Sequence, residues 1–157
     1  MKTDPAGATG ANPARDDTRR LIGIDIGGTK CAVGVWREGR VEEVARFATG
    51  SWDEAYRRLC EAVAPLERGT EMVFGVSCGG PLDAAAGVIL HPPNLPPSWH
   101  GVPIVRHLTT RFGGRAFLMN DANACALAEW RFGAGRGARH LIFLTCEIGR
   151  ASWRERV

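Results

Sequence analysis

Hydrophobic and polar residues change their spacing several times along the chain, and each change predicts an element. Residues 21–26 (LIGIDI) alternate large and small side chains into a Gly-Gly turn, and residues 31–36 (CAVGVW) resume the strand pattern. The REGR stretch that follows is typical of a hairpin turn, and residues 41–49 continue as a third strand. The pattern therefore predicts an antiparallel meander of three short strands at the start of the domain.

Beyond the meander the apolar spacing changes to three or four residues, which is the spacing of a helix. Ser51 or Asp53 can cap this helix. Its apolar positions are Ala55, Leu59, Ala62, Val63 and Leu66. A continuous apolar run then covers residues 72–78, predicts a strand buried on both faces, and ends in the turn Gly79-Gly80-Pro81.

The second half of the chain alternates between helix and strand patterns after a proline-rich loop, HPPNLPPSWHG. Residues 105–112 predict a helix, residues 116–120 a buried strand, and residues 121–132 a second helix that ends at Gly133. Residues 141–145 (LIFLT) have the composition of a buried strand, whereas the sequence from Glu147 onward shows neither helical nor strand periodicity. This order predicts an α/β layered domain with a mixed sheet.

Composition narrows the class of protein. The chain has 157 residues, enough for one domain, and its net charge of +3 is too small to indicate a nucleic-acid partner. Five cysteines without a C-x-x-C pair favour a reducing compartment. Residues 1–20 are polar and small, which predicts a disordered tail rather than a signal peptide, and no apolar run is long enough to span a membrane. We therefore expect a cytoplasmic protein that binds neither membranes nor nucleic acid.

The stretch IDIGGTK passes from one strand to the next through Gly27 and Gly28. Two adjacent glycines let backbone N–H groups point at one small concavity, as an anion requires. Beside them lie Asp25, which can hold a metal ion, and Thr29 and Lys30, which can contact phosphate oxygens. The pattern fits either an ordinary hairpin turn or a phosphate site, and its spacing differs from that of P-loops and dinucleotide fingerprints.

In MNDANACALAEWRFG a buried strand leads Asn120 and Asp121 into the first turn of an Ala-rich helix. An Asp at this place can be a structural cap that satisfies free backbone donors. The functional alternative is that Asp121 takes the proton from a hydroxyl nucleophile, while Asn120 orients that hydroxyl. These residues alone leave both interpretations open.

The turn in GVSCGGPLD and the proline-rich loop form a third candidate. Gly79 and Gly80 can offer backbone contacts to a polyol, and Asn94 or Trp99 can hydrogen-bond or stack on a sugar. A loop that is merely rigid explains the same residues. The four histidines lack the spacing of metal ligands, so no metal site is predicted.

Taken together, IDIGGTK, GVSCGGPLD and NDANACALAEWRFGAG resemble, in this order, three motifs of the ROK family of repressors, open reading frames and kinases. The resemblance runs from about Leu21 to Thr145. It implies an α/β fold of the actin-like ATPase and sugar kinase superfamily (ribonuclease H-like), with a mixed sheet that begins with the three-stranded meander. Residues 21–146 would then be the N-terminal lobe of a ROK-type sugar kinase.

The resemblance also implies roles for the residues of the three motifs. Asp121 would be the general base that deprotonates a hexose hydroxyl, and Asn120 and the Gly79-Gly80 backbone would hold the sugar. The phosphates of ATP and Mg²⁺ would be contacted by Asp25, Gly27, Gly28, Thr29 and Lys30. The implied activity is ATP-dependent phosphorylation of a hexose, either glucose or an N-acetylhexosamine, by an enzyme whose full-length form is a homo-oligomer.

The chain departs from the family pattern after Cys146. Family kinases continue into a Gly-rich second phosphate turn and a second lobe with a His and Cys zinc cluster, and here Glu147 follows instead. Residues 147–157 resemble no part of the family and look like a vector- or adapter-derived ending. The expectation is therefore that the zinc site is absent and that the 157-residue chain alone is inactive.

Two other classes share parts of the pattern. A sugar-sensing transcriptional repressor of the same family would carry a winged helix-turn-helix in front, and only twenty mostly polar residues precede Leu21. An actin-like ATPase module would share the first phosphate turn, although a base for a sugar hydroxyl, as in NDANA, has no use in a filament. The kinase interpretation accounts for all three motifs.

Overall fold

The protein is described from a computed structural model, which places residues 19–67, 69–147 and 150–156. Its centre is a five-stranded mixed sheet with the strand order β3-β2-β1-β4-β7. The strands are β1 (Arg19–Ile26), β2 (Lys30–Arg37), β3 (Arg40–Ala48), β4 (Glu71–Cys78) and β7 (Arg115–Asn120). The sequence predicts a disordered tail at residues 1–20. Residues 1–18 lie outside the described residues, and Arg19 and Arg20 belong to β1.

The first three strands form the antiparallel meander that the sequence predicts. β1 pairs with β2, and β2 pairs with β3, in both cases antiparallel. Glu38 and Gly39 connect β2 to β3 and have φ angles of 50° and 86°. Positive φ at both central residues is the hairpin geometry that matches the twist of the flanking strands, and Gly supplies it without steric cost.

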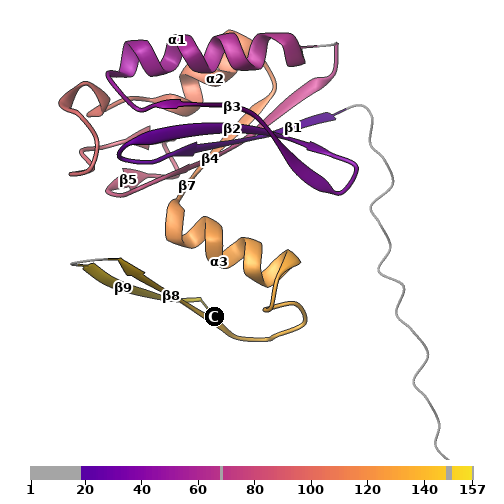
Figure 1. Ribbon diagram of the computed structural model, residues 1–157, viewed down its shortest axis with the longest axis vertical. Coiled ribbons are helices and arrows are strands. Elements are labelled where there is room, and N and C mark those ends of the chain that lie inside the picture. The colour runs from indigo at the N-terminus through magenta and orange to yellow at the C-terminus, as the bar shows by residue number, and fades with distance from the viewer. Residues whose placement is uncertain (1–18, 68, 148–149, 157) are drawn as a thin grey trace, which may run out of the picture.

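Helices cover the two faces of the sheet unequally (Figure 1). Helices α1 (Trp52–Val63) and α2 (Ile104–Phe112) lie on one face, and α3 (Asp121–Phe132) lies on the other. The chain also forms four short elements: η1 (Ala64–Leu66), β5 (Leu82–Asp83), β6 (Val88–Ile89) and η2 (Pro97–Trp99). None of the helices in the described ranges is long and apolar enough to cross a membrane.

The core lies between the sheet and the layer of α1 and α2. It contains every second residue of the central strands, such as Ile22, Ile24 and Ile26 in β1. The prediction that residues 72–78 are buried on both faces is wrong, because burial alternates along β4 and Gly75 is exposed. The same holds for β7, where Leu118 is buried and Phe117 is 59% exposed. Only one face of the sheet is fully covered, so the strands alternate as a half-exposed sheet does.

The last two strands form a separate hairpin. β8 (Leu141–Glu147) pairs antiparallel with β9 (Arg150–Arg156) and with no strand of the main sheet. The prediction of a buried strand at residues 141–145 is therefore right about the strand and wrong about burial, since Ile142 and Leu144 are 62% and 65% exposed. The stretch after Glu147 lacks strand periodicity, yet Arg150–Arg156 forms strand β9, which pairs with β8.

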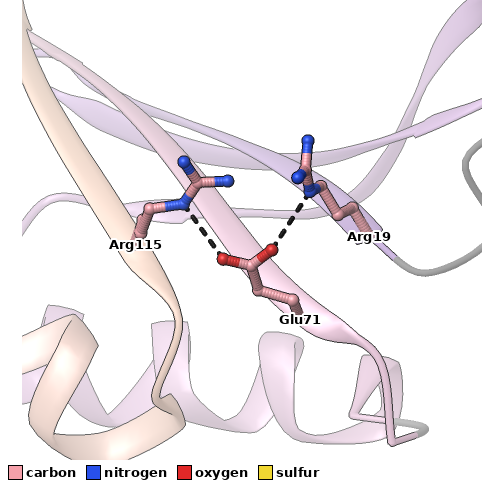
Figure 2. A network of polar contacts seen from close by, with 3 residues as sticks. All are labelled: Arg19, Glu71 and Arg115. Carbon is pink, nitrogen blue, oxygen red and sulfur yellow. Dashed lines mark hydrogen bonds and ion pairs between the residues drawn. The ribbon is translucent and has the colours of Figure 1, made fainter.

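An ion-pair network ties the three parallel strands together at their amino-terminal ends. Glu71 at the start of β4 accepts hydrogen bonds from the Nε atoms of Arg19 at 3.1 Å and Arg115 at 3.0 Å (Figure 2). The two arginines come from β1 and β7, the neighbours of β4 on either side. These side chains are about half exposed, so each pair contributes no more than about 1 kcal/mol. The network helps to fix which residues of the three strands lie side by side.

The start of α1 is a capping box that the sequence signals as S-x-x-E. The Ser51 hydroxyl accepts the backbone N–H of Glu54, and the Glu54 carboxylate accepts the backbone N–H of Ser51 at 3.2 Å. We predict that Ser51→Ala lowers the free energy of unfolding by about 1 kcal/mol. For a domain of this size the thermal midpoint falls by about 2 to 4 °C, measurable by circular dichroism.

The effect of this substitution also depends on pH. Hydrogen bonds from Ser51 lower the pKa of Glu54 in the folded state. The stabilisation from this carboxylate is therefore present above its ordinary pKa and is lost as the pH falls through the lowered value. The difference between wild type and Ser51→Ala should shrink in acid. Thr110→Ala, at an exposed position of α2, is the control and should not lower the midpoint.

Candidate functional site

The carboxyl ends of the three parallel strands lie in one row across the sheet. Ile26 of β1 pairs with Cys78 of β4, and Cys78 pairs with Asn120 of β7. The chain leaves each strand at this row, so the three segments that follow start from neighbouring points at one edge. Outside the carboxyl ends of parallel strands is where open α/β sheets bind their ligands.

The first segment is the turn of Gly27, Gly28 and Thr29, which we call the phosphate turn. The sequence predicts that both glycine N–H groups face an anion, and for Gly27 this is wrong, because its N–H donates to the Lys30 carbonyl at 2.9 Å and closes the hairpin. No hydrogen bond from the N–H groups of Gly28 or Thr29 is found in the described part of the chain. These two donors are therefore available to a ligand, and Lys30 is exposed beside them.

Asp25 lies two residues before the turn, on the face of the sheet opposite the core. The Ser77 hydroxyl of β4 donates to its carboxylate Oδ1 at 2.5 Å, and the two residues are direct neighbours in the pairing of β1 with β4. The carboxylate is thus oriented from the adjacent strand while it remains exposed. Sequence reasoning did not select Ser77, because a single Ser in an apolar strand carries no pattern.

Asn94 of the proline-rich loop joins the phosphate turn to the second segment, the Gly79-Gly80 turn. A Cβ added at Gly28 would lie 2.9 Å from the Asn94 carbonyl oxygen, and one added at Gly79 would lie 3.1 Å from Asn94 Nδ2. Close approach of the Asn94 backbone therefore favours glycine at position 28, and at position 79 a Cβ would have to displace the Asn94 side chain slightly. The sequence marks Asn94 as a possible sugar contact, and its place between the two turns follows only from the path of the loop.

The third segment is the start of α3. Asn120 is the residue before the helix, and its side chain makes no capping hydrogen bond. Asp121 is the first helical residue rather than the N-cap, but its carboxylate accepts the free backbone N–H of Ala122 at 2.7 Å, as the structural interpretation expects. The carboxylate is exposed. Asn120 Oδ1 is buried without a hydrogen-bond partner in the described structure, and its Nδ2 lies close to Gly80.

The ring of Trp99, which the sequence suggests could stack on a sugar, is not available to a ligand at this edge. It is 1% exposed, its indole Nε1 donates to the Gly50 carbonyl at 3.1 Å, and its ring packs edge-on against Trp52. Because a buried indole needs a partner for its N–H, this arrangement is that of a core residue that anchors the loop.

A cleft of about 880 Å³ runs along the open face of the sheet beneath α3. Asp25 and Ser77 line it near the row of strand ends. The rest of its lining is mostly apolar and includes Phe117, Trp130 and Phe132. Of the candidate site, Asp25 and Ser77 therefore border this largely apolar cleft.

Three thiols near the site are kept protonated by their surroundings. Burial raises the pKa of Cys78 to about 12, with further contributions from the negative charges of Asp121 and Asp25. Burial also raises the pKa of Cys31, and partial desolvation raises the pKa of Cys125, whose side chain is exposed. Both carboxylates belong to residues next to the row of strand ends that contains Cys78. Among the described residues, no group of three or more His, Cys, Asp and Glu side chains is placed to hold a metal ion.

Comparison with known proteins identifies the family. The family model described as "ROK family" matches residues 21–150. The chain belongs to the ROK family. Glucokinase of Thermotoga maritima is 38% identical over 135 residues, which are 83% of this chain and 42% of that enzyme. A putative xylose repressor of Caldicellulosiruptor is 34% identical over 89 residues, 57% of this chain and 22% of the repressor.

A solved ROK structure shows the same architecture. The crystal structure of a ROK family glucokinase from Streptomyces griseus, in complex with glucose and AMPPNP, superposes with a TM-score of 0.70 at 33% identity and covers 87% of this chain and 46% of that one. The predicted actin-like ATPase and sugar kinase fold is thereby confirmed. The chain spans less than half the length of either glucokinase.

The environment of the thiols gives a direct test of the geometry at the strand ends. At pH 8, Cys78 should react with iodoacetamide about a thousandfold more slowly than a thiol of ordinary pKa, because the thiolate is the reactive species. Cys125, which is exposed, should be labelled well before it. Mass spectrometry of peptides from the labelled native protein measures both rates. Equal labelling of the two thiols in the native state would contradict the burial of Cys78, and labelling in urea provides the unfolded control.

Proposed function

We propose that this chain is the part of a ROK sugar kinase that holds the sugar and begins the ATP site, and that the complete protein phosphorylates a hexose with ATP. The observation that supports this is the meeting of the phosphate turn, the Gly79-Gly80 turn and Asp121 at one row of strand ends. Glucose is the first candidate, because the glucokinase relatives quoted above match most of this chain. An N-acetylhexosamine is the second.

In the proposed reaction Asp121 is the general base. Its carboxylate is exposed, and its one hydrogen bond in the described structure, from Ala122, leaves lone pairs free for a substrate hydroxyl. Asn120 lies next to it with an unpartnered side-chain oxygen, and a buried oxygen without a donor costs about 1–3 kcal/mol. A sugar hydroxyl that donates to Asn120 would remove this cost. In this proposal Asn120 Nδ2, which lies close to Gly80, and the Gly79-Gly80 backbone hold the other side of the sugar.

The phosphates of ATP would be held by the free N–H groups of Gly28 and Thr29 and by the Lys30 ammonium. A single carboxylate suffices for Mg²⁺ when phosphate oxygens and water supply its other ligands, so Asp25 fits this ion. Mg²⁺ bound there would neutralise charge on the phosphates. Phosphoryl transfer depends mainly on alignment and charge neutralisation, and the fixed strand ends provide the alignment.

A second candidate is a sugar-responsive regulator of the same family, which the match to the putative xylose repressor favours. A regulator needs the sugar contacts of Asn120 and the Gly79-Gly80 turn but no general base. The two candidates therefore differ in what Asp121 does after sugar has bound.

The test uses a complete protein in which residues 1–145 of this chain precede the part of the T. maritima glucokinase that lies beyond the matched segment. With glucose and Mg·ATP this protein should release ADP in a coupled assay. Asp121→Asn should lower kcat by at least about 10²-fold, because general base catalysis contributes at least that much, while glucose binding measured by calorimetry persists.

Two further proteins make the result decisive. Asp53→Asn removes an exposed carboxylate on α1, on the covered face of the sheet, and should leave kcat unchanged. The 157-residue chain alone should show no sugar-dependent ADP release. Full turnover by Asp121→Asn would refute the assigned base, and glucose binding without any turnover by the unsubstituted protein would favour the regulator.

A further inference from the structure

Thr49 lies directly after β3, and the kinase proposal gives it no role. Thr49 is 2% exposed. Among the described residues it is the polar residue that is buried as a whole. A buried hydroxyl is costly unless it is hydrogen-bonded, so its partners show what it is for. Two of its hydrogen-bond partners, the Gly27 and Thr29 carbonyls, belong to the phosphate turn, and the third is the Cys31 thiol of β2.

Thr49 holds the phosphate turn at two points. Its hydroxyl donates to the Gly27 carbonyl at 2.6 Å, and its backbone N–H donates to the Thr29 carbonyl at 3.1 Å. The Cys31 thiol donates to the Thr49 hydroxyl oxygen at 3.7 Å. Because this thiol stays protonated in its buried position, the hydroxyl receives one hydrogen bond and directs its own proton to Gly27.

The bond to Gly27 has a geometric consequence for the next residue. The Gly27 carbonyl and the Gly28 N–H belong to the same planar peptide unit, and in a trans peptide they point in opposite directions. A carbonyl fixed toward buried Thr49 therefore aims the Gly28 N–H away from the core. That N–H is one of the two donors left free for a phosphate.

We propose that Thr49 is a positioning residue, whose hydroxyl holds the Gly27–Gly28 peptide so that the Gly28 N–H faces a bound phosphate oxygen. The proposal rests on the proposed function of the phosphate turn. Without the hydroxyl, the peptide unit loses the contact that sets its orientation, and Gly27 and Gly28 have no Cβ to restrict rotation. Phosphate affinity then falls even where the fold is intact.

The experiment measures the Gly28 amide and anion binding in the ¹⁵N-labelled 157-residue chain. Three variants are compared with wild type: Thr49→Val, Thr49→Ser and Thr70→Val. Thr49→Val keeps the shape and removes the hydroxyl, and Thr49→Ser keeps the hydroxyl. Thr70 is the matched control, because its buried hydroxyl has no hydrogen-bond partner in the described structure. Inorganic tripolyphosphate and Mg·AMPPNP are titrated separately, and circular dichroism records folding.

We expect Thr49→Val to shift the Gly28 amide resonance and to weaken tripolyphosphate binding about tenfold, the effect of one lost hydrogen bond. Thr49→Ser and Thr70→Val should stay within about twofold of wild type. Equal affinities for Thr49→Val and wild type overturn the proposal, and so does an equal loss in Thr49→Ser, which would show that packing matters rather than the hydroxyl.

The kinase proposal and the Thr49 proposal can fail separately. If the wild-type chain binds the anions and Thr49→Val binds them equally well, only the role of Thr49 is refuted. If the wild-type chain binds neither anion, the phosphate turn is not a phosphate site, and the Thr49 proposal falls with it. Loss of folding in Thr49→Val moves the decision to Thr49→Ser and Cys31→Ala, which removes the thiol that orients the hydroxyl and should weaken binding less than the valine.

Discussion

The in-register parallel pairing of β1, β4 and β7 is the constraint on which the candidate site depends. Parallel strands end at the same edge of a sheet, and here Ile26, Cys78 and Asn120 form one row. The segments after these residues are 52 and 42 residues apart in sequence and start as neighbours in space. A slip of one residue in any strand would move its side chains to the other face and separate the three turns. The strand register thus determines which residues come together at the candidate site.

Contacts at both ends of the strands support the site. At the amino-terminal ends, Glu71 joins Arg19 and Arg115 across three strands (Figure 2). At the carboxyl ends, Asn94 packs against both glycine turns, and Thr49 bonds to the phosphate turn. The first feature lies far along the strands from the site and has a structural role only. The second touches the turns themselves, so a change there alters the site without a change in register.

The meander, the helix after Ser51 and the helix from Asp121 follow from the sequence because each is a periodic pattern with a clear boundary. The three motifs could likewise be found, since each combines a strand end with glycine or an acid. Contacts that depend on the path of the chain could not be predicted from the sequence. Thr49 and Ser77 contact residues 22 and 52 positions away in the sequence, and no motif marks either of them. The separation of β8 from the main sheet leaves no trace in its composition.

Because helices cover the two faces of the sheet unequally, the candidate site is supported by packed residues on one face only. On the open face Gly34, Gly23 and Gly75 lie in register across three strands and add no side chains to the cleft beneath α3. α3 itself buries no residue, so it cannot fix the strand ends by packing. On the covered face the core extends to the strand ends. There the buried Thr49 fixes the phosphate turn through its hydrogen bond to the Gly27 carbonyl. The orientation of the turn is therefore set by the packed face, and the open face remains free for ligand.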